Sequence, residues 1–193
     1  MTPGLRQFAL VLATAIIPAC TPVEVAVGAG TATGVAASQE RGIVTSAKDS
    51  AISVQIQELW FRTNYEMFGK LSTSVSEGRA LLTGKVQDPE MRVEAVKLAW
   101  QVDGIAEVIN EIEVVNTGSL ADSARDFWIT TQLRGRLPFD KDIRSINYSI
   151  DTVNGTVFLM GIARNQAELD RVTNHARNLA YVRRVVSYVR VTA

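Results

Sequence analysis

The stretch Asn154-Gly155-Thr156-Val157-Phe158-Leu159-Met160-Gly161 is a turn followed by a short apolar run that ends at a glycine. A related stretch, Glu77-Gly78-Arg79-Ala80-Leu81-Leu82-Thr83-Gly84, lies 77 positions earlier, the interval from Gly78 to Gly155 and from Gly84 to Gly161. The same offset relates further pairs: Ser46 and Ser123, Asp49 and Asp126, Ala99 and Ala176, and Val114 and Val191. A constant offset held over such a span is an internal repeat. The chain therefore contains two copies of one module.

Length and composition place the chain among globular proteins. Its 193 residues allow one or two domains, and 47% hydrophobic residues exclude a disordered chain. The formal net charge is zero, so bulk attraction to nucleic acid is not expected.

The charge is distributed unequally between the copies. Residues 48–114 hold 7 Lys and Arg against 11 Asp and Glu, a net charge of −4. Residues 125–193 hold 11 Lys and Arg against 6 Asp and Glu, a net charge of +5. The second copy is therefore the one suited to an anionic partner.

The amino-terminal residues resemble a bacterial lipoprotein signal. Arg6 precedes an uncharged apolar run from Phe8 to Ile17, about half of the roughly 20 residues that a membrane-spanning helix needs and typical of a signal-peptide core. The run ends at Ile17-Pro18-Ala19-Cys20, which resembles a lipobox. We expect a signal peptide at residues 1–19 and lipidation of Cys20, which would hold the protein on a membrane. Cleavage nearby by an ordinary signal peptidase and a buried free cysteine are the alternatives.

Residues 20–45 are expected to be a tether, since they are mostly Ala, Gly, Val and Thr without a helical or strand period. The glycines of this segment, Gly28, Gly30 and Gly34, lack the Lys-Ser/Thr ending of a phosphate-binding loop. Cys20 is the only cysteine, so no disulfide can form within the chain.

Each module is predicted to contain a helix, a hairpin, a second helix and a final strand. Ser46 and Ser123 each stand three residues before an aspartate, the spacing of a capping box at a helix start. Apolar residues follow at helical spacing: Ile52, Ile56 and Leu59 in the first copy, and Ile129, Leu133 and Leu137 in the second. Alternating apolar residues around the turn glycines, Gly78 and Gly155, predict a hairpin with a turn longer than the tightest type, closed by Gly84 and Gly161.

The second helix of the first module begins at Asp88-Pro89-Glu90, a cap followed by proline and an acid. Its buried face is predicted to contain Ala95, Leu98, Ala99 and Val102, matched in the second copy by Val172, His175, Ala176 and Leu179. The last strands carry Val108, Ile112 and Val114, and Val185, Val189 and Val191. Residues 62–69 and 139–146 show no clear period.

These elements predict an α+β fold of two tandem α-β-β-α-β modules, at residues 46–115 and 122–193. Each would have a three-stranded sheet with two helices packed on one face, which satisfies the two-layer rule for a small domain.

The modules resemble the BON domain. The resemblance rests on Trp128-Ile129-Thr130-Thr131 with Gly155-x-Val157-Phe158-Leu159-Met160-Gly161, and on Val102-Asp103-Gly104 with Val108-Ile109-Asn110-Glu111-Ile112. One departure is Tyr181, where the family usually has glycine before the last strand. Two such domains behind a lipobox and a tether resemble dual-BON outer-membrane lipoproteins.

The resemblance implies a non-enzymatic lipoprotein of the outer membrane that faces the periplasm and supports envelope integrity. It implies that the first helix of the second BON domain binds anionic phospholipid, with phosphatidylglycerol or cardiolipin as the expected lipids. It also implies a link to the division site and to the outer-membrane protein assembly machinery.

The residues of that helix suggest the same surface independently. Phe127, Trp128, Thr131 and Arg134 lie roughly opposite its apolar stripe. Tryptophan beside a cation suits the boundary between lipid headgroups and water. Arg125 and Arg136 would flank the site, whereas the first copy has Ser50, Ala51, Val54 and Gln57 at the positions of the four central residues. The alternative is that Phe127 and Trp128 dock on the other module or on the tether.

No catalytic, cofactor-binding or metal-binding motif appears in the sequence. His175, the only histidine, is expected to be a satisfied core residue, and Glu111 and Glu113 are expected to face solvent. The chain is therefore not expected to be an enzyme. Two other functions remain open: a protein–protein adaptor that docks an outer-membrane assembly partner, and a soluble periplasmic stress protein if Cys20 is not lipidated.

Overall fold

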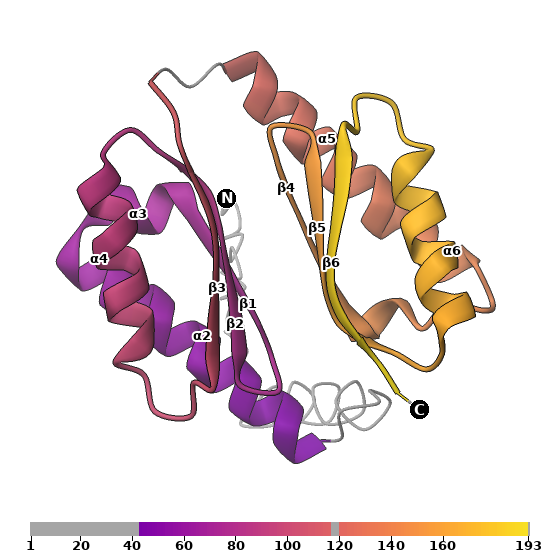
Figure 1. Ribbon diagram of the computed structural model, residues 1–193, viewed down its shortest axis with the longest axis horizontal. Helices are drawn as coiled ribbons and strands as arrows, with labels where there is room; N and C mark the ends of the chain where they lie inside the picture. Colours follow the sequence, from indigo (N-terminus) through magenta and orange to yellow (C-terminus); the bar gives the residue numbers. More distant parts are fainter. Residues whose placement is uncertain (1–42, 117–119, 193) are drawn as a thin grey trace, which may run out of the picture.

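The computed structural model describes residues 43–116 and 120–192 (Figure 1). The expected signal peptide, the lipidation at Cys20 and most of the tether lie outside these residues. The first module contains α2 (Ile43–Thr63), α3 (Tyr65–Lys70), β1 (Leu71–Ser76), β2 (Arg79–Val86), α4 (Pro89–Trp100) and β3 (Glu107–Val114). The second contains α5 (Leu120–Arg136), the short 3-10 turns η1 (Leu137–Phe139) and η2 (Ser145–Asn147), β4 (Tyr148–Val153), β5 (Thr156–Ala163), α6 (Gln166–Arg177) and β6 (Arg184–Val191).

The two sheets have the same topology, which confirms the predicted repeat of an α+β module. In each, the middle strand is antiparallel to the strand before it and parallel to the last strand, giving the orders β1-β2-β3 and β4-β5-β6. The registers also agree, since Leu71 pairs with Gly84 as Tyr148 pairs with Gly161. The irregular segments differ, with α3 in the first module and η1 and η2 in the second.

Each module buries one face of its sheet beneath its two long helices. The first core includes Ile56, Trp60 and Ala99, and the second includes Ile129, Leu133 and Ala176. Trp60 is fully buried and its indole nitrogen donates to the carbonyl of Ala95 at 3.1 Å, which ties α2 to α4. Both clusters are formed by residues between 52 and 191, so we expect residues 41–193 to fold without the preceding segment.

The predicted capping boxes are wrong. Ser46 and Ser123 lie inside α2 and α5, which begin at Ile43 and Leu120. The aspartates of the motif act at long range instead. The Asp126 carboxylate accepts hydrogen bonds from the amides of Asn154 and Gly155 at 2.9 and 2.8 Å.

Asp49 accepts equivalent bonds from Glu77 and Gly78 at 2.9 and 3.0 Å. Each aspartate thus fixes the hairpin turn to the first helix of its module. The turns have two residues rather than the longer type predicted, and both residues have positive φ, 56° and 73° at Glu77 and Gly78, as a type I′ turn requires.

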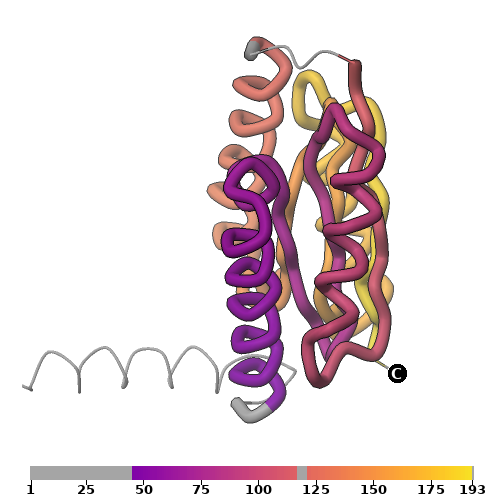
Figure 2. The backbone as a smooth tube through the Cα atoms, turned by 90° about the vertical axis from the view of Figure 1, so that its left-hand side faces the viewer, coloured from indigo at the N-terminus to yellow at the C-terminus, as the bar shows by residue number. Residues whose placement is uncertain are grey.

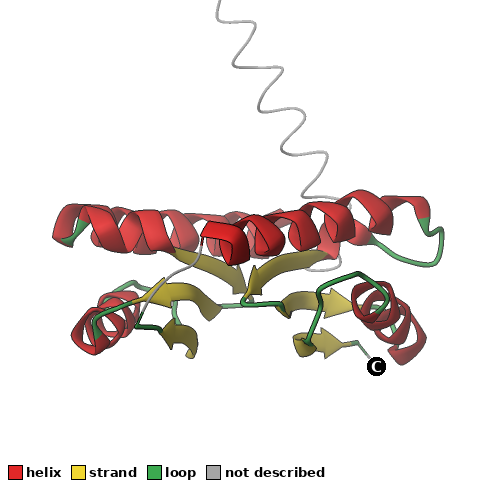
Figure 3. Cartoon of the chain, turned by 90° about the horizontal axis from the view of Figure 1, so that it is seen from above, coloured by secondary structure: helices red, strands yellow, loops and turns green. Residues whose placement is uncertain are grey.

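The sheets pack against each other through the faces that the helices leave uncovered (Figures 1 and 3). Leu81 of β2 joins Val153, Phe158 and Met160 of the second module in one buried cluster. The helices therefore lie on the outside. Helices α2 and α5 lie on one side of the packed sheets and α4 and α6 on the other (Figures 2 and 3).

Polar contacts join the modules around this cluster. Lys85 pairs with Asp126 at 3.0 Å, and Thr83 donates a hydrogen bond to Asp151. The expectation that Glu111 and Glu113 face solvent is wrong. Glu111 accepts a hydrogen bond from the Tyr188 hydroxyl, and Glu113 accepts one from the side-chain amide of Asn154. Both glutamates have these partners because the second module covers the open face of the first sheet.

Within the described ranges, no helix has both the length and the apolar character needed to cross a membrane.

Candidate functional site

Helix α5 separates a buried face from an exposed face, as its periodicity predicts. Ile129, Leu133 and Leu137, the last just beyond the helix, are buried in the core of the second module. On the other side, Phe127 is 74% exposed and Trp128 is 38% exposed. Two adjacent aromatic side chains are therefore available on the surface of the basic module.

Trp128 forms a surface cluster with Tyr181, which lies between α6 and β6. Their ring centroids are 5.9 Å apart in an edge-to-face arrangement, and the Arg125 guanidinium carbon lies 5.9 Å from the Tyr181 centroid. Arg125 also pairs with Asp122 at 2.8 Å. Tyr181 covers part of Trp128 while its own side chain stays 63% exposed. Sequence reasoning had placed no function on Tyr181, although its replacement of a glycine was visible.

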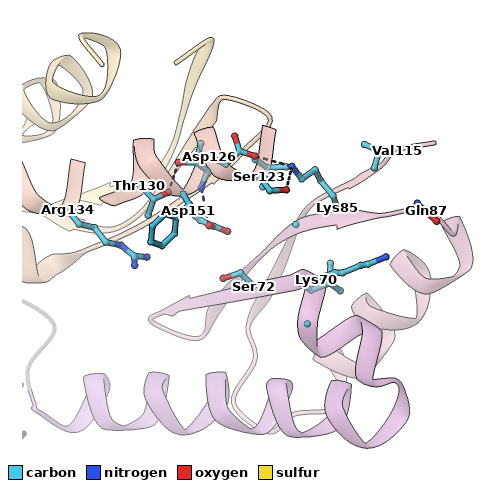
Figure 4. A pocket seen from close by; sticks show the side chains of 16 residues that line it. Lys70, Ser72, Lys85, Gln87, Val115, Ser123, Asp126, Thr130, Arg134 and Asp151 are labelled. Atoms are coloured by element: carbon cyan, nitrogen blue, oxygen red, sulfur yellow. Dashed lines mark hydrogen bonds and ion pairs between the residues drawn. The ribbon is translucent and has the colours of Figure 1, made fainter. Parts of the chain in front are cut away.

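Phe127 and Arg134 lie on another side of α5, along a groove of about 570 Å³ between the modules (Figure 4). Arg134 donates to the carbonyl of Ile150 at 2.6 Å, which holds its guanidinium at the edge strand β4. Phe127 lines the groove but is not buried in it, so docking on the first module does not hide this ring.

The groove carries charges of both signs. Lys70 and Lys85 reach it from the first module, and Arg134, Asp126 and Asp151 from the second (Figure 4). Burial raises the pKa of Asp151, against the opposing effect of the hydrogen bond from Thr83. Each cation has an acidic neighbour, since Lys70 pairs with Glu66, Lys85 pairs with Asp126, and the charge of Arg134 acts on Asp151. Among the residues that the structure describes, the groove therefore offers no unpaired cation to an anion.

The predicted site is therefore divided. Trp128 and Arg125 belong to the cluster with Tyr181, and Phe127 and Arg134 border the groove. Thr131 and Arg136 are exposed on α5.

The first module has an exposed aromatic cluster that the sequence analysis missed. Phe61 of α2 contacts Tyr65 and Phe68 of α3, with centroid distances of 5.9 and 5.4 Å, and all three rings are exposed. They fall in and beside residues 62–69, where no period was found. Their spacing of four and three residues was the available signal, since such residues share one helix face.

The sequence analysis expected His175 to be enclosed in the core, but the structure shows that it is not. It lies half-buried at the rim, where its Nε2 is 3.0 Å from the Asp140 carboxylate. This hydrogen bond, more than any other interaction, lowers the pKa of Asp140. The pair connects α6 to the turn after η1. Within residues 43–116 and 120–192, no cluster of side chains suited to a metal ion is found.

Comparison with known proteins agrees with the modular fold. The BON domain model matches residues 48–116 and 125–193. A protein of Anaplasma centrale with the name "Uncharacterized protein in gshII 5'region" is 41% identical over 144 residues, which cover 74% of this chain and 94% of that protein.

Two further relatives match most of this chain. The outer membrane lipoprotein DolP of Haemophilus influenzae is 26% identical over 184 residues, 94% of each chain. Osmotically-inducible protein Y of Escherichia coli is 27% identical over 139 residues, 71% of this chain and 69% of that one. Since the matched residues fall in both halves of the repeat, the chain belongs to the BON-domain family, with one BON domain in each module.

Proposed function

We propose that this protein is a non-enzymatic outer-membrane lipoprotein, anchored through Cys20 and facing the periplasm, that supports outer-membrane integrity. Its second BON domain binds anionic phospholipid, phosphatidylglycerol or cardiolipin, through α5. The similarity to an outer membrane lipoprotein over 94% of both chains supports the location. The exposed pair Phe127 and Trp128 beside Arg125 carries the proposal for lipid.

The physical basis is the difference between the modules. An indole ring is favoured at the headgroup boundary, and each basic residue near an anionic surface contributes about 1 kcal/mol of attraction. The second module offers both, whereas the first has Ser50 and Ala51 in place of the two aromatic residues and carries net negative charge.

Vesicle co-sedimentation of residues 41–193 tests the proposal without the lipid anchor. We expect salt-sensitive binding to phosphatidylglycerol vesicles and none to phosphatidylcholine vesicles, with Trp128→Ala and Arg134→Glu each weakening it. Trp100→Ala is the matched control, because Trp100 is an exposed tryptophan of the first module. Equal binding to both vesicle types, or binding indifferent to Trp128→Ala, would refute a lipid site on α5.

A protein–protein adaptor is the second candidate, favoured by the exposed rings of Phe61, Tyr65 and Phe68. A photo-crosslinking amino acid that replaces Tyr65 should then capture one protein of the outer-membrane assembly machinery. The same amino acid in place of Arg92 should capture none. Mass spectrometry of the mature amino terminus separates both candidates from a soluble periplasmic stress protein, because only a lipoprotein carries acyl chains on Cys20.

A further inference from the structure

Tyr181 has a backbone conformation that its residue type disfavours. Its φ is 68°, in the left-handed region, where the Cβ of an ordinary residue crowds the neighbouring carbonyl. The equivalent residue of the first module is Gly104, with φ of 93°, and glycine has no such penalty. Residues in this conformation cost about 1–3 kcal/mol and cluster at binding and active sites, so the presence of a tyrosine at this position needs explanation.

The ring of Tyr181 does not stabilise the core. It is largely exposed, touches the edge of Trp128 and lies under the guanidinium of Arg125. It therefore extends the aromatic surface of α5 onto the loop before β6.

Beside this ring is a hollow of about 320 Å³. Arg125 enters it from α5 and Arg183 from the residues before β6. Its acids are already engaged, because Asp122 pairs with Arg125 and Asp126 binds the turn amides and Lys85. Arg183 forms no ion pair with any residue that the structure describes. The hollow is therefore suited to an anion.

The first module forms the same loop without these side chains. The amide of Arg183 donates to the carbonyl of Gly155 at 2.8 Å, and the amide of Ala106 donates to Gly78 at the same distance. At the positions of Trp128, Tyr181 and Arg183 the first module has Ala51, Gly104 and Ala106. Since Ala, Gly and Ala suffice for the fold, the aromatic and basic residues of the second module are not required by it.

We propose that Tyr181 and Arg183 complete the lipid site of α5, and that the hollow between Arg125 and Arg183 holds the phosphate of an anionic phospholipid headgroup. Guanidinium groups bind phosphate oxygens through paired, charge-assisted hydrogen bonds. The rings of Trp128 and Tyr181 would lie at the level of the headgroups, where amphipathic aromatic residues are favoured. The hollow suits a headgroup, with the acyl chains left in the bilayer. This assignment rests on the proposed binding of lipid by α5.

The repeat supplies the test variants. Tyr181→Gly and Arg183→Ala install the residues of the first module, so the loop should keep its fold, and thermal unfolding verifies this. In co-sedimentation of residues 41–193 with phosphatidylglycerol vesicles, we expect the double variant to bind about tenfold more weakly, the scale of losing one charge-assisted contact. Arg184→Ala is the charge-matched control. It removes the neighbouring positive charge, which lies near Tyr188 rather than in the hollow. It should weaken binding less than the double variant does, by at most about fivefold, which is the bulk attraction of one basic residue.

The outcomes separate this inference from the function on which it rests. Wild-type binding that is lost with Trp128→Ala but unchanged in the double variant would overturn the headgroup site and leave lipid binding by α5 intact. An equal loss with Arg184→Ala would also overturn it, because bulk charge would then explain the effect. Absence of wild-type binding would overturn both.

A lipid headgroup is distinguished from free phosphate by titration of the isotope-labelled fragment. We expect the Trp128 indole NMR signal to shift with monomeric dihexanoyl-phosphatidylglycerol at lower concentration than with inorganic phosphate. A shift at lower concentration with phosphate would assign the hollow to the free anion and overturn the lipid assignment.

Discussion

Lys85 of the first module and Asp126 of the second form an ion pair of 3.0 Å across the boundary between the modules, with side chains only 18% and 9% exposed. Asp126 also accepts two amide hydrogen bonds from the β4–β5 turn. One carboxylate therefore holds a turn of its own module and the neighbouring module at once.

Replacing the lysine should weaken the boundary. We expect Lys85→Met to lower the free energy of unfolding by about 1–3 kcal/mol, because a nearly buried carboxylate loses a charged partner. Urea unfolding measures the change. Lys97→Met, at an exposed lysine that lies 3.8 Å from Glu94, should cost less than about 1 kcal/mol. A loss of equal size in the two variants would contradict a specific role for the boundary pair.

The two turn-binding aspartates should each stabilise the fold. Asp49→Ala and Asp126→Ala each leave two turn amides without their carboxylate, which we expect to cost about 2–4 kcal/mol. Asp126→Ala also removes the partner of Lys85. Chemical denaturation of both variants, with exposed Asp103→Ala as the control, measures the cost. Losses no larger than that of Asp103→Ala would contradict the role of the turn bonds.

Gly161 should be irreplaceable in β5. A Cβ there would lie 1.9 Å from the carbonyl oxygen of Asn147, and the residue has φ of 138°, so we expect Gly161→Ala to cost more than about 3 kcal/mol. Gly135→Ala is the matched control, since nothing lies within 4 Å of its added methyl group. As a helical position, it should gain up to about 1 kcal/mol. Thermal unfolding distinguishes the two variants, and tolerance of Gly161→Ala would contradict the close approach of β5 to Asn147 of η2.

The stability of the second module should depend on pH through Glu168. Burial alone would raise the pKa of this carboxylate, but bonds from the amides of Arg144 and Arg164 and from the Arg164 guanidinium together hold it below its ordinary value of 4.5. A group with a lowered pKa stabilises the fold fully above its unfolded value, and this contribution disappears as the pH falls through the folded value.

We therefore expect the melting temperature to fall between about pH 6 and pH 3, and Glu168→Gln to show a lower melting temperature at pH 7 and a shallower fall. Glu94→Gln, at a residue that faces solvent in part, should keep the wild-type dependence. Circular dichroism at several pH values measures both, and an unchanged slope in Glu168→Gln would assign the acid sensitivity to other groups.

The sequence predicted the repeated module, the turn glycines and the buried faces because those features depend on local periodicity and on backbone conformations that few residues tolerate. It did not predict the role of Asp49 and Asp126, because the pattern Ser-x-x-Asp looks local while its carboxylate acts on a turn 28 residues away. It also placed Glu111 and Glu113 in solvent. Strand alternation shows which residues share a face, but not what covers that face.

The candidate site was predicted as one surface and is divided into two. Helical geometry alone placed Phe127 and Trp128 together, but their surroundings come from distant segments: the groove beside Phe127 from the first module, and Tyr181 beside Trp128 from the loop before β6. Phe61, Tyr65 and Phe68 have the spacing of one helix face, but they span the break between α2 and α3 at Asn64, so no single continuous helix carries them.

The sheet-to-sheet boundary has a consequence for how such chains arise. A single module would leave an apolar sheet face, such as that of Phe158 and Met160, open to water, and would need a second polypeptide to cover it. When the two modules are covalently linked, each is held at a high local concentration near the other, so the two sheet faces meet without a bimolecular encounter. The opposite net charges of the copies also disfavour association of like with like. Gene duplication can in this way convert a dimer into a monomer, leaving the outer helix of one copy free to acquire a new surface.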